Sequence, residues 1–116
     1  MAKHAIPDPL ERRHLVERSS SPEQALQMAE LYLADGRSWD AIAFLVKAGA
    51  RERLAALREE AVAAGDAFLV RELSRALGDA PSTEVWRRVA EAAAAAGKER
   101  YASQALALAE RVEGRS

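Results

Sequence analysis

Apolar residues recur along the chain every three to four positions, with polar residues between them, which is the period of an amphipathic α-helix. Alanine, leucine, glutamate and arginine, which all favour helices, fill most of the positions. β-Branched and aromatic residues are sparse and never alternate with polar residues over the length of a strand. The pattern therefore predicts an all-α protein without strands.

Prolines, glycines and capping residues divide this pattern into about seven helices. Asp8-Pro9 and Ser21-Pro22 each have the order of an N-cap followed by a proline in the first helical turn. Glycines mark the breaks farther along the chain, because glycine adopts the left-handed conformation after a helix at little cost. The predicted helices cover approximately residues 8–17, 22–36, 38–48, 50–64, 66–77, 82–96 and 99–112.

The last six of these helices are expected to pair, because their connections are too short for any arrangement but antiparallel neighbours. Gly36, Gly65 and Gly97 occupy the same place in each pair and are separated by 29 and 32 residues. A period in this range is typical of helical repeats, in which each hairpin has too little core of its own and stacks on its neighbours. The predicted hairpins cover about residues 22–48, 50–78 and 82–112.

Two of the hairpins share a detailed pattern of large, small and turn residues. The pattern reads Ala25, Met28, Ala29, Tyr32, Gly36, Ala41, Leu45 and Ala48 in the first hairpin, and Trp86, Val89, Ala90, Ala93, Gly97, Ala102, Leu106 and Ala109 in the third. This pattern resembles that of the tetratricopeptide-repeat family. The resemblance implies a right-handed α-solenoid of about three antiparallel hairpins behind a short N-terminal helix, with the first helix of each hairpin lining a concave surface.

The small residues of this pattern have a physical role, since two helices approach to about 8 to 10 Å only where the side chains between them are short. Ala29 is therefore expected to face Ala41, and Ala90 to face Ala102. The middle hairpin departs from the pattern, with Arg58 in place of a small residue and valine in place of the first alanine of its second helix. It is either a degenerate repeat or part of a helical-hairpin solenoid of another type.

Length and composition are consistent with one domain, expected at residues 8–113 after a flexible segment at 1–7. The chain has 116 residues and no cysteine, so packing alone must stabilise it. It carries 17 basic and 18 acidic side chains, which leaves little net attraction to nucleic acid or to an acidic membrane. No secretory signal or membrane-spanning stretch is recognisable, so we expect a cytoplasmic protein without membrane contact.

No motif indicates catalysis or a cofactor. The two histidines, His4 and His14, lack the spacing of a metal site, and no phosphate-binding loop or nucleophile elbow occurs. Adjacent Glu59 and Glu60 have the arrangement of an ordinary solvated helix face. The segment 36–49 resembles a helix-turn-helix in layout, but its second helix offers apolar residues where a recognition helix exposes base-reading side chains. We therefore expect a protein that is not an enzyme and binds neither metal nor cofactor.

Aromatic residues are expected to anchor the core, because each lies within an apolar helical stripe. These anchors are Trp39, Phe44, Phe68 and Trp86. The last helix is different, since Leu106, Leu108 and Val112 lie among charged residues. Its outer side is either an interface or a thin cap of the solenoid.

Glutamates recur in the first helix of every hairpin, in pairs seven residues apart, which places each pair on one helix face. By the resemblance, these positions face the concave groove. Glu23, Glu52 and Glu84 lie in first turns, where acidic side chains also complement the helix dipole. The helix dipole does not explain Glu30, Glu59 and Glu91, because these glutamates lie in the middle of their helices. Intrahelical pairs of Glu84 with Arg88 and of Arg87 with Glu91 would neutralise part of the charge.

These observations predict a non-catalytic protein–protein interaction module, an adaptor or scaffold, which binds a basic peptide segment of another protein along the concave surface. The expected partner-binding residues are Glu23, Leu26, Glu30, Leu33, Glu52, Glu59, Val62, Glu84, Arg87 and Glu91. Two alternatives remain open. One is a self-assembling homo-oligomeric scaffold, and the other, less favoured, is a nucleic-acid binder that relies on Arg12, Arg13 and Arg18.

Overall fold

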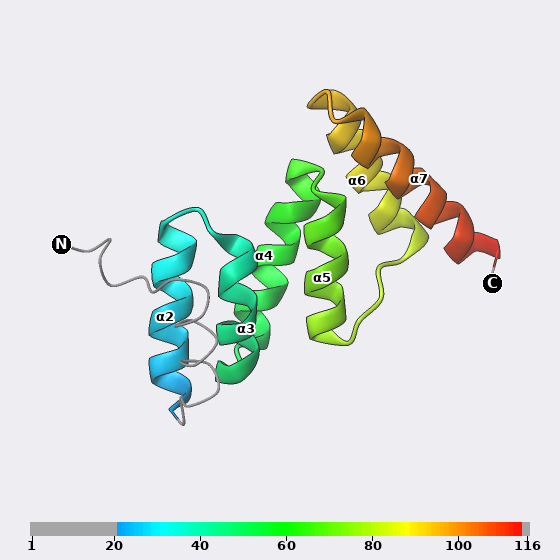
Figure 1. Cartoon of the computed structure of the whole chain (residues 1–116). Helices are drawn as coiled ribbons and strands as arrows, with labels where there is room; N and C mark the ends of the chain where they lie inside the picture. Colours follow the sequence, from blue (N-terminus) through cyan, green and yellow to red (C-terminus); the bar gives the residue numbers. More distant parts are fainter. Residues whose placement is uncertain (1–20, 115–116) are drawn as a thin grey trace. The chain divides into compact units, whose positions relative to one another are not determined.

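The computed structural model describes residues 21–114, and this part of the chain consists of six α-helices without a strand. In order they are α2 (Pro22–Ala34), α3 (Ser38–Ala48), α4 (Arg51–Ala64), α5 (Ala67–Leu77), α6 (Thr83–Ala95) and α7 (Glu99–Gly114) (Figure 1). The all-α prediction is confirmed, and the predicted helix limits agree closely with the observed ones. The predicted segments 1–7 and 8–17, with their histidines and arginines, lie outside the described residues.

Capping residues mark several of the helix ends. The hydroxyl of Ser21 accepts a hydrogen bond from the backbone of Gln24 at 3.3 Å, and the hydroxyl of Ser82 caps α6 in the same way. Gly49 and Gly78 end α3 and α5 in the left-handed conformation. Local sequence thus determines the limits of these elements, because the caps satisfy backbone groups that a helix end leaves unpaired.

Two compact units make up the chain, one ending at Leu54 and the other beginning at Ala55. In the first unit α2 packs against α3. Ala29 and Ala41 are both fully buried, as expected for a close helix approach. Beside them the rings of Tyr32 and Phe44 stack with their centroids 5.5 Å apart.

In the second unit α6 packs against α7, and α5 contacts both. The turn between α4 and α5 lies against the backbone of α6 at Gly65, where a Cβ atom would come within 2.6 Å of the Cα of Ala93. The ammonium group of Lys98, at the start of α7, donates a hydrogen bond of 3.0 Å to the carbonyl of Ala64 at the end of α4. Glycine is thus required at position 65 by both its φ of +71° and the close approach of another helix.

Arg58, which stands where the repeat pattern predicts a small residue, forms contacts of its own. Its guanidinium, on α4, donates hydrogen bonds to the hydroxyl of Ser74 at 3.3 Å and to the backbone carbonyl of Asp79 at 2.9 Å. A third hydrogen bond, also 2.9 Å, reaches the Asp79 carboxylate. A long side chain at this position therefore joins α4 to the C-terminal end of α5, a contact that an alanine could not form.

The predicted aromatic anchors divide into two groups. Phe44 and Trp86 are buried, which confirms the prediction for these two residues. It is wrong for Trp39 and Phe68, which are 52% and 42% exposed. Both are the second residue of their helix, and the ring of Phe68 lies edge-on to that of Tyr101, at 5.3 Å between ring centroids.

Candidate functional site

The mid-helix glutamates of α2 and α4 bind arginines on α4 and α6. Within the first unit, Arg53 on α4 donates two hydrogen bonds to the carboxylate of Glu30 on α2, at 2.8 and 3.2 Å. Within the second unit, Arg88 on α6 lies 3.5 Å from the carboxylate of Glu59 on α4. The glutamate series is thus partly neutralised by ion pairs between helices, which the spacing of the glutamates alone did not reveal.

The two pairs differ in strength. The Arg53 guanidinium binds Glu30 in the bidentate geometry that favours arginine–carboxylate pairs, whereas Arg88 and Glu59 form a longer and more exposed contact. The hydrogen bond from Arg53 lowers the pKa of Glu30 below its ordinary value, against a smaller opposing effect of burial. Glu30 therefore loses its charge at a lower pH than an unpaired glutamate.

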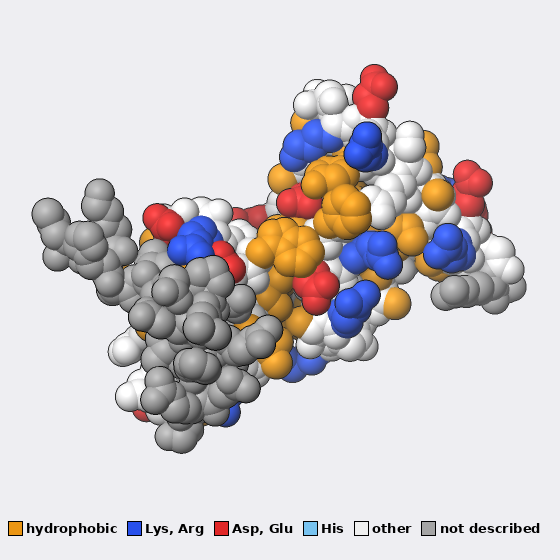
Figure 2. All heavy atoms as spheres, in the orientation of Figure 1, with side chains coloured by type: hydrophobic (Ala, Val, Ile, Leu, Met, Phe, Trp, Pro, Cys, Tyr) orange, Lys and Arg blue, Asp and Glu red, His pale blue; other side chains and the backbone are white. Residues whose placement is uncertain are grey.

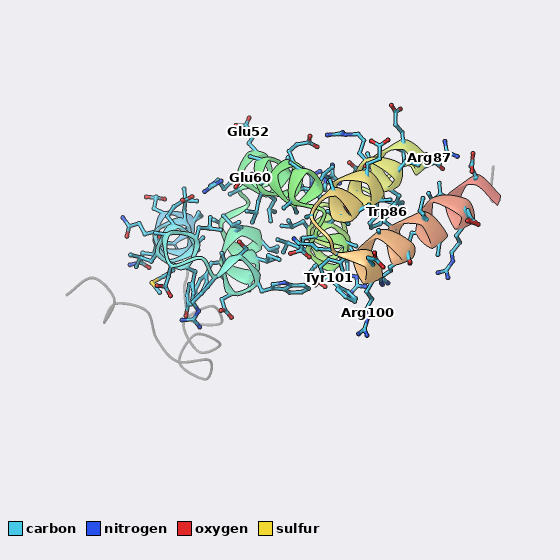
Figure 3. All side chains as sticks on the ribbon, turned by 90° about the horizontal axis from the view of Figure 1, so that it is seen from above. Glu52, Glu60, Trp86, Arg87, Arg100 and Tyr101 are labelled. Atoms are coloured by element: carbon cyan, nitrogen blue, oxygen red, sulfur yellow. The ribbon has the colours of Figure 1, made fainter. Side chains whose placement is uncertain are left out.

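The intrahelical pairs that the sequence suggested on α6 do not form. Arg88 turns to Glu59, and Arg87 binds Glu113 on α7 at 2.8 Å. Figure 3 shows Arg87 on the outer side of α6. In the described part of the chain, Glu91 has no ion-pair partner and its side chain is exposed.

A hollow of about 640 Å³ follows the exposed face of α2 and is here called the α2 groove. It brings together three of the predicted partner-binding residues, Glu23, Leu26 and Glu30. The side chain of Leu26 is 38% exposed. Sequence reasoning missed the other two, although all five share the helical spacing of one face. Among the described residues its lining consists of Glu23, Leu26, Gln27, Glu30 and Leu31.

The remaining predicted residues lie outside this groove. Leu33 is half-buried on α2 and does not line it. Val62 on α4 is only 1% exposed, so its side chain is packed inside the protein and is not accessible to a partner. Glu52 on α4 points outward (Figure 3), and Glu84 on α6 is also exposed.

The described residues otherwise offer few features of a recognised site. Between residues 21 and 114, no three His, Asp or Glu side chains gather as metal ligands would. Over the same range, none of the helices is both long enough and apolar enough to cross a membrane. Comparison of the chain with protein-family models, with curated proteins and with solved structures gave no match.

Proposed function

We propose that the chain is a non-catalytic protein-interaction module, a right-handed solenoid of three antiparallel hairpins, which binds a basic segment of another protein along its first helices. The α2 groove carries this proposal, because it combines two carboxylates with an exposed leucine on one helix face. The buried alanines at positions 29, 41 and 90, where tetratricopeptide repeats have small residues, support the solenoid.

The charges and apolar groups of the groove have separate roles. Glu30 already binds Arg53, whereas the carboxylate of Glu23 forms no ion pair within the described residues and is open to a partner. Leu26 and Leu31 provide apolar area, which contributes most of the affinity when it is covered. Charge on such a surface accelerates association and selects the partner more than it strengthens the complex. A helical or extended segment with lysine or arginine beside an apolar residue fits this arrangement.

The proposal is tested with a fluorescein-labelled amphipathic peptide of lysine and leucine, whose binding is followed by fluorescence anisotropy. Leu26→Ala should weaken binding by about tenfold, since burying a leucine is worth roughly 1.5 to 3 kcal/mol. Glu23→Gln should slow association and reduce its dependence on salt.

The matched controls are Leu106→Ala and Glu110→Gln, which alter exposed residues of α7 in the other unit. They should leave binding unchanged. Equal losses from Leu26→Ala and Leu106→Ala, with circular dichroism unaltered, would remove the α2 groove as the binding surface.

Self-assembly is a second candidate function, and Leu106 is the observation that favours it. Leu106 and Leu45 occupy equivalent positions, each nine residues after the turn glycine of its proposed hairpin. Leu106 is 50% exposed, whereas Leu45 is fully buried. A second copy would bury Leu106 in the same way. Light scattering at high protein concentration tests this, and a monomer there would exclude the scaffold.

A further inference from the structure

We propose that a pocket at the C-terminal end of α5 binds an acidic peptide segment that carries a large apolar side chain. The pocket lies entirely in the second unit, between the last turns of α5, the link at residues 78–81, the start of α6 and the last turns of α7. It is distinct from the α2 groove and has charges of the opposite sign, so neither proposal depends on the other.

The inner surface of the pocket is apolar. Trp86 is buried beneath it, and Leu108 and Val112 of α7 line it as half-buried side chains. Its volume of about 540 Å³ lies within the range of natural ligand sites, which are commonly about 300 to 1,000 Å³. A phenylalanine or leucine side chain from a partner would find both the space and the apolar contact here.

Basic side chains dominate the polar part of the lining, which includes Arg71, Arg75 and Arg111 but only one carboxylate, that of Asp79. Figure 2 shows basic side chains over α5 and α7 on the face that it presents. The Asp79 carboxylate is already bound by Arg58 at 2.9 Å, and therefore does not neutralise the three arginines of the pocket.

Two of these arginines are available to a ligand. Arg75 lies 3.6 Å from Glu72 one turn away, whereas Arg71 and Arg111 are exposed and have no ion pair within the described residues. They come from different helices, α5 and α7. Guanidinium groups bind carboxylates with two parallel hydrogen bonds, so an acidic ligand satisfies both arginines while its apolar part fills the pocket.

The lining also distinguishes among acidic ligands. Trp86 is only 3% exposed, so no aromatic face is presented for the stacking of nucleic-acid bases. An extended peptide instead offers a carboxylate and an apolar side chain on neighbouring residues, and both kinds of surface occur in this one pocket. The charge and the shape of the site therefore favour an acidic, apolar peptide.

Trp86 also provides the measurement. The chain has two tryptophans, and Trp39→Phe, at an exposed position, leaves Trp86 as the only fluorescent indole. The Trp39→Phe protein is titrated with an acetylated, amidated peptide that alternates glutamate with phenylalanine, and with the same peptide containing lysine in place of glutamate. We expect a saturable change of Trp86 emission with the acidic peptide only, at a Kd below about 1 mM.

Arginine variants in the same background locate the site. Arg71→Gln and Arg111→Gln should each weaken binding about 5- to 10-fold, because each removes a charge-assisted hydrogen bond. Arg100→Gln, at an exposed position of α7 outside the pocket, makes the same change of net charge and should have no effect (Figure 3).

Three results would overturn the proposal. They are the absence of a saturable signal, equal binding of the lysine peptide, and equal affinities in the Arg71, Arg111 and Arg100 variants when circular dichroism shows all of them folded. Light scattering is run in parallel. If the protein self-associates and Arg111→Gln abolishes this, the pocket belongs to a second copy of the chain and the peptide assignment is wrong.

Discussion

Arg53 binds Glu30 through two hydrogen bonds of 2.8 and 3.2 Å, and this pair joins α2 to α4. Both side chains are partly exposed, at 35% and 47%, so solvent screens their attraction. The pair nevertheless lowers the pKa of Glu30, and this links the stability of the first unit to pH.

A carboxyl whose pKa is lowered by folding stabilises the protein above its unfolded pKa and loses that effect as the pH falls through its folded pKa. Glu30→Gln should therefore reduce the free energy of unfolding by at most about 1 kcal/mol at neutral pH. The difference from the unmodified protein should shrink as the pH drops below the ordinary value of 4.5. Urea unfolding at several pH values measures it, with Glu91→Gln as the unpaired control. A difference that persisted unchanged in acid would show that the ion pair is not its source.

Gly65→Ala is expected to be the most damaging substitution at a turn glycine. The new Cβ would meet the backbone of Ala93 in α6, and the left-handed φ adds about 1 to 2 kcal/mol for any other residue. We expect a total loss of at least about 2 kcal/mol in urea unfolding. Gly36→Ala is the matched control, because Gly36 has a similar φ of +73° and no atom within 4 Å of its Cβ position. Equal losses at the two glycines would show that the α4–α5 turn does not pack on α6.

Overpacking the buried alanines tests the close approach of the helices. Ala29→Leu and Ala90→Leu should each cost roughly 1 to 3 kcal/mol, because the two positions are 0% and 5% exposed and leave no room for three more carbon atoms. Ala95→Leu, at an exposed position near the end of α6, should be nearly neutral. Thermal unfolding separates these outcomes, and an unchanged Tm for the first two variants would contradict the packing.

Arg58→Ala removes the contacts between α4 and the C-terminal end of α5. It deletes three hydrogen bonds to Ser74 and Asp79 and leaves the buried Ser74 hydroxyl without its arginine donor. We expect a loss of about 1 to 3 kcal/mol in chemical denaturation. Arg100→Ala, an exposed arginine of α7, is the control and should change the free energy of unfolding by less than about 0.5 kcal/mol. If Arg58→Ala is no worse than the control, the three hydrogen bonds contribute little to folding.

Sequence was sufficient for the helices, because their limits depend on local residues such as Ser82 and Gly78 that cap backbone groups within one turn. It was not sufficient for burial within an apolar stripe. Trp39 and Phe44 are both aromatic residues of α3, yet Trp39 is 52% exposed and Phe44 is fully buried, because burial depends on where the neighbouring helices lie.

Partner choice among charged side chains was also inaccessible to the sequence. Within α6, Arg88 was a plausible partner for Glu84, and Arg87 for Glu91. Instead, Arg88 binds Glu59, 29 positions upstream, and Arg87 binds Glu113, 26 positions downstream. Such pairs depend on the rotation of each helix about its axis, which spacing within one helix does not determine. The face containing Glu23, Leu26 and Glu30 was predictable because it belongs to a single helix.

The ion pairs between α2, α4 and α6 also have a direction along the chain. In both pairs the glutamate belongs to the earlier helix and the arginine to the later one. Arg53 lies 12 residues before Gly65, and the residue 12 before Gly36 in α2 is Gln24. Arg88 lies nine residues before Gly97, and the residue nine before Gly36 is Gln27, so α2 has an uncharged glutamine at both positions. In the proposed solenoid, a rearranged gene that placed the first hairpin after the third would therefore set Glu91 against glutamines. The order of the proposed hairpins would thus be encoded in side-chain charge as well as in chain connectivity, and a hairpin added by duplication would need its own arginine to continue the series.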